Sequence, residues 1–284
     1  MTTTSRLRRL TVGAALGAVA ALALTACAFA GESAPAASED GSLPTLTAGK
    51  LTIATGEPAY DPWIVDNDPS NQKGFESAVS YALAEKLGFS ADDVVWVRST
   101  FDSAIAPGPK DWDLNIQQFS VTDERKQAVD FSSPYYTTSQ AVVTSDSSAA
   151  ANATTIDELK GYTVGVMSGT TSYTVAAEEL GTDKLSVFNN NDDVVLAFQS
   201  GQIDAFVIDL PTAFYLANAE LDGGKILGQF ADTTGGDQLA YVLPKGSELT
   251  DPVSKALDEL RADGTLDELQ KTWLSEAVDV PVLG

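Results

Sequence analysis

The sequence contains no histidine among its 284 residues. Ser-His-Asp and Cys-His nucleophile systems, zinc sites with histidine ligands and acid–base catalysis by histidine are therefore excluded. The spacings of a phosphate-binding loop, a dinucleotide-binding fingerprint and an EF-hand are absent as well. We therefore expect neither a metal ion nor a cofactor, and we assign no catalytic residue.

Cysteine is almost as scarce, because Cys27 is the only one in the chain. A disulfide within the chain is impossible, so the folded part must be stabilised by its core. Hydrophobic residues make up 44% of the sequence. A chain of this length and composition can bury one large core or two moderate ones.

Basic residues are few, since 17 Lys and Arg stand against 40 Asp and Glu, which gives a net charge of -23. A nucleic-acid-binding protein needs a basic surface, so we expect no nucleic-acid partner. We interpret the acidity as a solubility device. Salt screens charges beyond about 8 Å, so the net charge cannot by itself select a ligand.

The N-terminal residues have the pattern of a secretory signal. Three arginines between positions 6 and 9 precede an uncharged run to residue 26, which is too short and too rich in alanine for a membrane span. Residues 24–27 read Leu-Thr-Ala-Cys and resemble a lipobox, in which Cys27 would be diacylated. An ordinary signal peptide with an incidental cysteine is the alternative. We expect a lipoprotein signal peptide at 1–26 and a protein held by lipid on the outer face of the cell membrane.

The composition changes after the expected signal. Residues 27–48 are rich in Ala, Ser, Pro, Gly and acids and contain few large apolar residues. This composition predicts a flexible tether that keeps a folded body at some distance from the lipid anchor.

From residue 50 onward, short apolar strands alternate with helical periods. Strands are expected at 51–55, 94–97, 113–119, 138–143, 163–167, 185–188 and 205–208, and helices at 75–87, 172–180, 192–200 and 211–219. The alternation predicts right-handed β-α-β units around mostly parallel sheets. A polar stretch at 145–152 interrupts the pattern, which then restarts and so predicts a second α/β lobe.

The segment 120–136 carries the most informative arginine. A strand-like run precedes it, and Thr122 with two acids behind it is typical of a helix N-cap. Arg125 is thus expected at a strand-to-helix turn, where its planar and permanently charged guanidinium suits a carboxylate. The alternative is a solvated helix arginine paired with Asp123 or Asp130.

This segment reads Ser-Val-Thr-Asp-Glu-Arg-Lys-Gln-Ala-Val-Asp-Phe-Ser-Ser-Pro-Tyr-Tyr and resembles the signature of the extracellular solute-binding proteins of family 3. The resemblance extends from about residue 50 to residue 273. It implies an α/β, two-lobed periplasmic-binding-protein-like fold of type II, in which each lobe is a mostly parallel sheet flanked by helices. The implied ranges are 49–142 with 238–284 for the first lobe, 143–237 for the second, and hinge strands near 138–143 and 238–243.

The resemblance also implies a function and a set of partners. Proteins of this family are receptors of ABC importers for polar amino acids. We therefore expect an exported, monomeric protein that binds an amino acid between its lobes and presents it to a membrane permease with an ATPase inside the cell.

The same resemblance assigns residues to the ligand's carboxylate. Arg125 would clamp this group, and Ser120 would add a hydroxyl or backbone donor. Gly169, Thr170 and Thr171 lie between a strand and a helix, where free N–H groups and the positive end of the helix dipole suit the same carboxylate. For Thr170, plain helix capping is the alternative.

Further residues are assigned to the rest of the ligand. Asp209 ends a strand and occupies the family position that accepts the ligand's ammonium, with a helix N-cap as the other interpretation. Tyr60 and Phe101 match the two aromatic residues that sandwich the ligand's side chain, and core packing is the alternative for both.

Selectivity for the side chain depends on residues that depart from the family pattern. Glu57 matches the acid that meets the distal end of the ligand. Long amides at Gln117 and Gln118 replace small residues and would narrow or rim the pocket, which leaves room for an unusual ligand. Phe119 and Met167 complete the lining. Because Met167 offers no charge to an acidic side chain, a polar neutral or cationic amino acid is favoured over glutamate.

A different class of function remains open. A few enzymes share this fold, such as dehydratases acting on small cyclic carboxylic acids. Glu57 and Asp209 could act as acid or base in such an enzyme if burial raised their pKa values. The intact arginine, threonine and aspartate positions and the expected lipid anchor favour the receptor.

Overall fold

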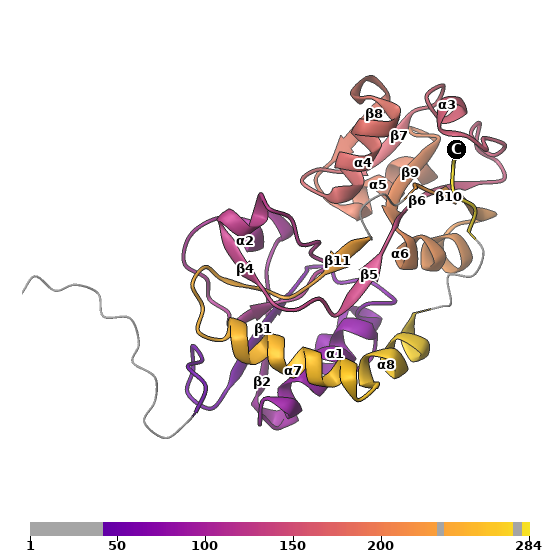
Figure 1. Ribbon diagram of the computed structural model, residues 1–284. Coiled ribbons are helices and arrows are strands. Elements are labelled where there is room, and N and C mark those ends of the chain that lie inside the picture. Colours follow the sequence, from indigo (N-terminus) through magenta and orange to yellow (C-terminus); the bar gives the residue numbers. More distant parts are fainter. Residues whose placement is uncertain (1–41, 232–235, 275–279) are drawn as a thin grey trace, which may run out of the picture. The chain divides into compact units, whose positions relative to one another are not determined.

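The structure is a computed structural model of the chain and describes residues 42–231, 236–274 and 280–284. The expected signal peptide at 1–26, the lipidation residue Cys27 and most of the expected tether lie outside these ranges. The described residues form two five-stranded sheets and one two-stranded sheet, with helices around them (Figure 1). No helix within these ranges is long and apolar enough to cross a membrane.

The first sheet has the strand order β2-β1-β3-β12-β4. Its strands are β1 (Leu51–Thr55), β2 (Val94–Arg98), β3 (Leu114–Asn115), β4 (Val129–Phe131) and β12 (Val242–Pro244). The strand β12 pairs antiparallel with both of its neighbours, whereas β1 pairs parallel with β2 and β3. Four of the five strands therefore run in one direction, as the mostly parallel prediction requires.

The helices of the first lobe cover its sheet. They are α1 (Phe75–Lys86), α2 (Phe101–Ile105), α7 (Thr250–Ala262) and α8 (Thr265–Trp273). Alternation along β1 sends Leu51 and Ile53 into a core with α1, α7 and α8, and sends Ala54 to the opposite core with Trp112. In Figure 1, α7 and α8 lie alongside α1.

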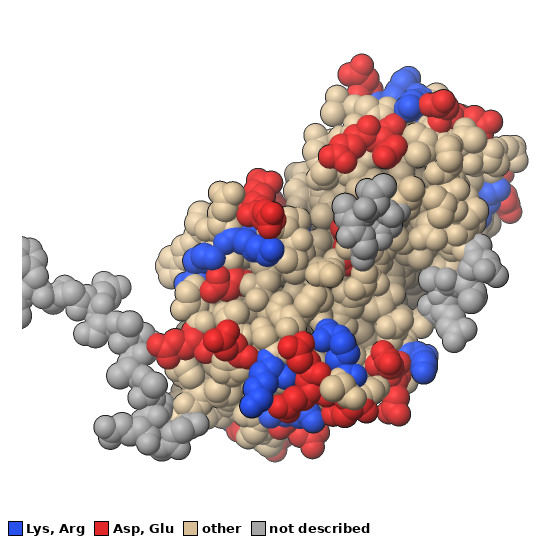
Figure 2. All heavy atoms as spheres, in the orientation of Figure 1, with Lys and Arg blue, Asp and Glu red and all other residues tan. Residues whose placement is uncertain are grey.

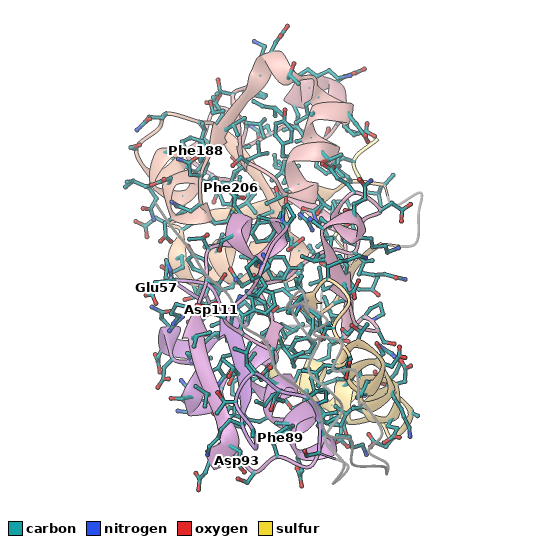
Figure 3. All side chains as sticks on the ribbon, turned by 90° about the vertical axis from the view of Figure 1, so that its left-hand side faces the viewer. Glu57, Phe89, Asp93, Asp111, Phe188 and Phe206 are labelled. Atoms are coloured by element: carbon teal, nitrogen blue, oxygen red, sulfur yellow. The ribbon has the colours of Figure 1, made fainter. Side chains whose placement is uncertain are left out.

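The second sheet has the order β10-β6-β9-β7-β8, and here β6 alone runs against the other strands. Its strands are β6 (Gln140–Ser145), β7 (Val164–Met167), β8 (Leu185–Phe188), β9 (Ala205–Asp209) and β10 (Gly224–Gln229). Val142 faces one core cluster and Val143 the other, so β6 is buried on both faces. Figure 3 shows Phe206 inside this lobe, whereas Glu57 and Asp93 lie at the outside of the molecule.

Helices surround this second sheet as well. They are α3 (Ile156–Leu159), α4 (Thr171–Leu180), α5 (Asn191–Gln199), α6 (Leu210–Tyr215) and a π-helical turn at Leu216–Glu220. The remaining short turns are 3-10 helices at Val65–Asn67, Pro69–Asn71, Ala91–Asp93, Arg125–Gln127 and Thr182–Lys184.

The two lobes are connected by the two-stranded sheet, in which β5 (Tyr136–Thr138) pairs antiparallel with β11 (Asp237–Leu239). The hinge strands expected near 138–143 and 238–243 are thus shorter and begin earlier. The expected lobe boundary at 142/143 falls inside β6, because β6 pairs along its length with β9 and β10 of the second sheet.

The last residues depart from the expected first lobe. Leu283 donates from its N–H to the carbonyl of Gln229 at 2.9 Å, and the N–H of Gln229 donates to the carbonyl of Pro281 at 2.8 Å. Leu283 also joins a core cluster of the second lobe. Of the described C-terminal residues, those up to Leu274 therefore pack on the first lobe, whereas Leu283 packs on the second.

The strand expected at 113–119 is shorter than its apolar pattern predicted. It ends at Asn115, and Gln118 adopts a left-handed backbone with φ of 51°. A residue with positive φ cannot continue a strand, so the chain turns out of the sheet before Phe119.

Charges at the surface are mixed: on the face drawn in Figure 2, Lys and Arg lie among Asp and Glu.

Candidate functional site

Arg125 lies at the start of a single 3-10 turn, and the hydroxyl of Thr122 accepts its backbone N–H at 3.1 Å. The side chain turns inward and is only 8% exposed. Its Nη1 donates to the carbonyl of Ser120 at 2.7 Å, and its Nη2 donates to the carbonyl of Gly169 in the second lobe at 2.8 Å. The solvated-arginine alternative is therefore wrong. The same burial lowers the pKa of this guanidinium.

The carboxylates that were the alternative partners of Arg125 are taken by lysines. Asp123 pairs with Lys126 at 3.1 Å, and Asp130 pairs with Lys245 at 2.8 Å. Within the described part of the chain, no ion pair neutralises Arg125. A buried guanidinium in this state is a strong binding group for an anion.

The turn 169–171 lies opposite Arg125. Thr170 caps α4 by accepting the N–H of Tyr173 at 3.1 Å, so the capping interpretation is correct for its hydroxyl. Thr171 contacts Ser120 hydroxyl to hydroxyl at 3.2 Å. The carbonyl of Gly169 accepts a hydrogen bond from Arg125, and its N–H remains a predicted donor to the ligand's carboxylate.

Asp209 is the last residue of β9. It occupies the N-cap position of α6, as the other interpretation expected, but its side chain makes no capping hydrogen bond. Oδ1 accepts a hydrogen bond from Nε2 of Gln140 at 2.6 Å. Burial raises the pKa of Asp209 to about 7, and the charge of Asp237 acts in the same direction, whereas Gln140 and Arg125 oppose the shift.

Gln140 and Asp237 were missed by the sequence reasoning. Nε2 of Gln140 donates to both Asp209 and Asp237, at 2.6 and 2.7 Å. Neither residue belongs to a recognisable motif, and both lie where the hinge strands meet the second sheet. Their position next to the hinge is the one signal that could have pointed to them.

A buried acid on the first lobe was also left out of the predicted site. Glu76 accepts the backbone N–H of Gln118 at 2.8 Å, and it also accepts hydrogen bonds from the Gln118 side-chain amide and the Tyr135 hydroxyl. Burial raises the pKa of Glu76 to about 7. In the sequence, Gly74-Phe75-Glu76 departs from the Gly-Phe-Asp of the family pattern, and this departure was the available signal. The three bonds hold Gln118 in its left-handed conformation.

Most of the predicted residues share one small cavity of about 50 Å³. Arg125 and Asp209 both line it, from different lobes. Of the other predicted residues, the structure brings together here Ser120, Thr170, Thr171, Phe101, Gln118 and Met167. Phe119 does not line it, because its ring stacks on Phe101 at 4.8 Å and is fully buried, so core packing is its role.

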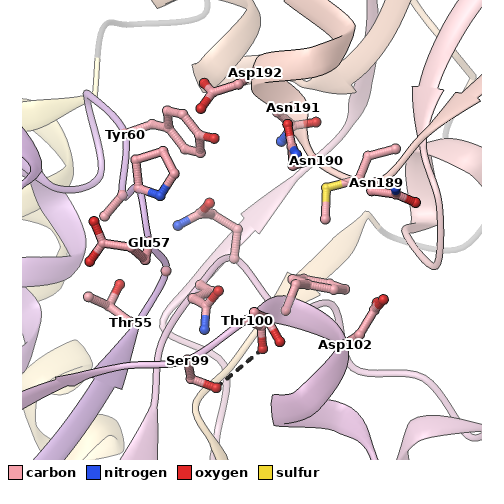
Figure 4. A pocket seen from close by; sticks show the side chains of 17 residues that line it. Thr55, Glu57, Tyr60, Ser99, Thr100, Asp102, Asn189, Asn190, Asn191 and Asp192 are labelled. Atoms are coloured by element: carbon pink, nitrogen blue, oxygen red, sulfur yellow. Dashed lines mark hydrogen bonds between the residues drawn. The ribbon is translucent and has the colours of Figure 1, made fainter.

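A larger cavity of about 430 Å³ shares Phe101, Gln118 and Met167 with the small one. Figure 4 shows its lining, which includes Tyr60 and Glu57 from the first lobe. The carboxylates of Glu57, Asp102 and Asp192 and the amides of residues 189–191 line the same chamber. We call it the side-chain chamber.

Two contacts set the charge of the side-chain chamber. Glu57 pairs with Arg98 at 3.1 Å but remains 58% exposed. Burial raises the pKa of the Tyr60 phenol, and the charge of Asp192 in the second lobe acts in the same direction. Among the described residues, neither lysine nor arginine lines the chamber. A third cavity of about 500 Å³ shares Tyr60 and Asp192 with the chamber and Asp209 with the small cavity.

Metal chemistry has no visible basis in the ranges the structure covers. No group of three or more His, Cys, Asp or Glu side chains in those ranges could hold a metal ion.

Comparison with known proteins agrees with this architecture. The profile of the bacterial extracellular solute-binding proteins, family 3, matches residues 51–276. The arginine-binding extracellular protein ArtP of Bacillus subtilis (strain 168) is 32% identical over 238 residues, which cover 80% of this chain and 88% of that protein.

Two solved structures resemble the chain closely enough to support the fold. An ancestral arginine-binding protein bound to arginine is 31% identical, with a TM-score of 0.66, covering 80% of this chain and 99% of that one. The ancestral amino acid-binding protein AncCDT-1, a precursor of cyclohexadienyl dehydratase, is 31% identical, with a TM-score of 0.67, covering 80% and 96%. With its two α/β lobes and a profile match over most of its length, the chain belongs to the bacterial extracellular solute-binding proteins of family 3.

Proposed function

We propose that this protein is the extracytoplasmic receptor of an ABC importer and that it binds an amino acid with a cationic side chain between its lobes. L-Arginine is the first candidate, since arginine is the ligand in the names of two of the similar proteins. The ligand would be captured, held by both lobes and delivered to a membrane permease.

The proposal is carried by Arg125 and Asp209, which line one small cavity with opposite charges. A free amino acid needs a cation for its carboxylate and an anion for its ammonium if both are to be buried. A guanidinium has five N–H donors, and Arg125 uses Nη1 and Nη2 on carbonyls, so donors remain for a carboxylate.

The choice of a cationic side chain follows from the side-chain chamber. Glu57, Asp102 and Asp192 line it, and the positive charge of Arg98 compensates only the first of them. Tyr60 and Phe101 line the same chamber, and aromatic faces attract cations. A ligand with a guanidinium or ammonium at its distal end fits these groups better than a ligand with an acid.

We further propose that the protein does not transform its ligand. Glu76 accepts hydrogen bonds from a phenol and two amide groups, so it lacks the free approach that general acid–base catalysis needs. Recovery of the bound ligand with unchanged mass after prolonged incubation would support this. A product of altered mass would favour the dehydratase-like alternative.

The expected export and anchoring also belong to the proposal. Diacylation of Cys27 would hold the monomeric receptor at the outer face of the membrane. Palmitate labelling of the full chain should give a labelled membrane fraction, and Cys27→Ser should remove the label while leaving ligand binding intact.

The test of the ligand class is a thermal-shift screen of the twenty amino acids, followed by calorimetry of those that raise the melting temperature. A ligand that binds only the folded state must stabilise it, so L-arginine and L-lysine should give the largest shifts. Shifts from acidic amino acids alone would overturn the cationic assignment, and no shift from any amino acid would overturn the proposed function.

A further inference from the structure

One side-chain amide bridges two carboxylates where the hinge meets the second lobe. Nε2 of Gln140 donates to Oδ1 of Asp209 at 2.6 Å and to Oδ2 of Asp237 at 2.7 Å. The hydroxyl of Ser172 donates to Oε1 of the same amide at 2.5 Å. Because carboxylate oxygens only accept hydrogen bonds, the NH2 group must face the two acids, and the amide has one orientation.

Gln140 and the two acids that it bridges come from three different strands. Gln140 is the first residue of β6 and lies opposite Asp209, the last residue of β9. Asp237 is the first residue of β11, where it lies opposite Thr138 in the hinge. The amide thus links the acid of the small cavity to a strand of the hinge, and Gln140 itself is only 4% exposed.

Two carboxylates so close to one donor repel each other. The charged and titratable groups that act on Asp209 are Arg125, Asp237, Glu76, Tyr135 and Tyr136. Of these, Arg125 supplies the positive charge, but it lies on the first lobe and bonds to carbonyls. The Gln140 amide is the group that compensates both acids at hydrogen-bonding distance.

We propose that Gln140 is a positioning residue for the ligand's ammonium group, because its amide lies between Asp209 and Asp237, bonds to both and favours the charged form of Asp209 that accepts that group. This inference rests on the receptor function proposed above. Without the amide, Asp209 would keep a proton up to a higher pH, and the ligand's ammonium would have to displace that proton before it could bind. Loss of the amide should therefore weaken binding most at low pH.

The experiment uses Gln140→Met, which keeps the length of the side chain and removes both donors. Its partner is the double variant Gln140→Met/Asp237→Asn, in which the second acid is gone. Gln202→Met is the matched control, because its amide bonds only to Ser200 at the surface. L-Arginine is titrated into each full-length protein by calorimetry between about pH 6 and pH 8.5.

For Gln140→Met, the affinity should fall on acidification by at least about tenfold more than for the wild type, since one pKa unit corresponds to a factor of ten. The double variant and Gln202→Met should both show the same pH dependence of affinity as the wild type. An equal loss of affinity at every pH would mean that Gln140 only fills space, and would overturn the proposal. A double variant as pH-sensitive as Gln140→Met would do the same.

Urea unfolding of the unliganded proteins separates this inference from the proposed function. If the wild type binds no amino acid, the receptor proposal fails, but the bridge still predicts a pH profile. A carboxyl whose pKa is raised on folding costs stability as the pH rises through that pKa. Between about pH 7 and pH 8.5, Gln140→Met should still lose stability while the wild type levels off, and parallel profiles would overturn the bridge.

Discussion

The indole Nε1 of Trp63 donates a buried hydrogen bond of 2.8 Å to the hydroxyl of Thr212, although the two residues belong to different lobes. Trp63 packs in the core of the first lobe, and Thr212 lies in α6 of the second. This bond can form only when the lobes are as close as they are here, so it favours the same arrangement that a ligand held by both lobes would favour.

Trp63→Phe should therefore weaken the ligand's affinity by roughly fivefold, because one hydrogen bond makes a net contribution of about 1 kcal/mol to the closed arrangement. Trp96→Phe is the matched control, since the Trp96 indole bonds to Tyr81 within the first lobe at 3.3 Å. Calorimetry with the best ligand of the screen checks both. Equal losses in the two variants would show that the interlobe bond has no special role.

Arg125→Ala should abolish tight binding. Removing the guanidinium leaves the ligand's carboxylate buried without a partner, which costs roughly 2 to 5 kcal/mol, or about 30-fold to several-thousand-fold in affinity. Arg261→Ala is the control, because Arg261 pairs with Asp258 on the surface of α7. A change of less than about threefold in calorimetry would rule out the clamp.

The side-chain chamber makes a prediction about selectivity. Asp192→Asn removes one negative charge from the wall that Asp192 shares with Tyr60, so the affinity for L-arginine should fall by about fivefold while that for L-glutamine stays nearly unchanged. Asp183→Asn, on a surface turn of the second lobe, should change neither affinity. If Asp192→Asn weakened both ligands equally, Asp192 would act through closure and not through charge.

Stability of the unliganded protein should depend on pH in an unusual direction. Burial raises the pKa of both Asp209 and Glu76 to about 7, well above their ordinary values near 4. The folded state then binds more protons than the unfolded state, so these groups favour folding below about pH 4 and lose that contribution as the pH rises to about 7. Other acids, whose pKa values are lowered on folding, make stability rise with pH instead. The contribution of Asp209 and Glu76 is therefore measured by comparing variants with the wild type.

Urea midpoints at about pH 5 and pH 8 measure this contribution. Asp209→Asn and Glu76→Gln should each reduce the loss of stability between the two values relative to the wild type. Asp183→Asn serves again as the control. If both variants lost as much stability between about pH 5 and pH 8 as the wild type, the raised pKa values would be contradicted.

Two glycines have similar backbone angles but different surroundings, so alanine substitutions at them distinguish backbone strain from steric crowding. Gly74 has φ of 93°, and an added Cβ would lie 2.4 Å from the carbonyl oxygen of Trp63, whereas Gly88 has φ of 89° and open space around it. Gly88→Ala should cost roughly 1 to 2 kcal/mol from the backbone alone. Gly74→Ala should cost roughly 1 to 3 kcal/mol more, because the start of α1 must move. Equal urea midpoints for the two variants would contradict this account.

The sequence predicted the alternation of strands and helices well because β1, β7 and β9 are short apolar runs, whose burial depends on local pattern. The hinge was placed a few residues late. Gln140 continues an apolar strand pattern, and only its pairing with Asp209 shows that β6 belongs to the second sheet. Pairing between distant segments leaves no local signal in one sequence.

The candidate site shows the same division. Arg125 and Asp209 could be predicted because each belongs to a motif at the end of a strand. The bridge through Gln140 could not, because it joins residues 69 and 97 positions apart that carry no motif. Glu76 was visible only as a departure from the family pattern, since its partners lie 42 and 59 positions away.

The position of β12 has a consequence for how the chain folds. This strand lies between β3 and β4, so residues 242–244 are needed to unite β4, the strand that directly follows the Arg125 turn, with the rest of the first sheet. The second sheet, by contrast, draws all five strands from one continuous stretch, 140–229. During synthesis the second lobe can assemble early, while the guanidinium is fixed in place only after nearly the whole polypeptide has emerged. A prematurely terminated chain would then have a complete second sheet but an incomplete first lobe, so no two-lobed site could form.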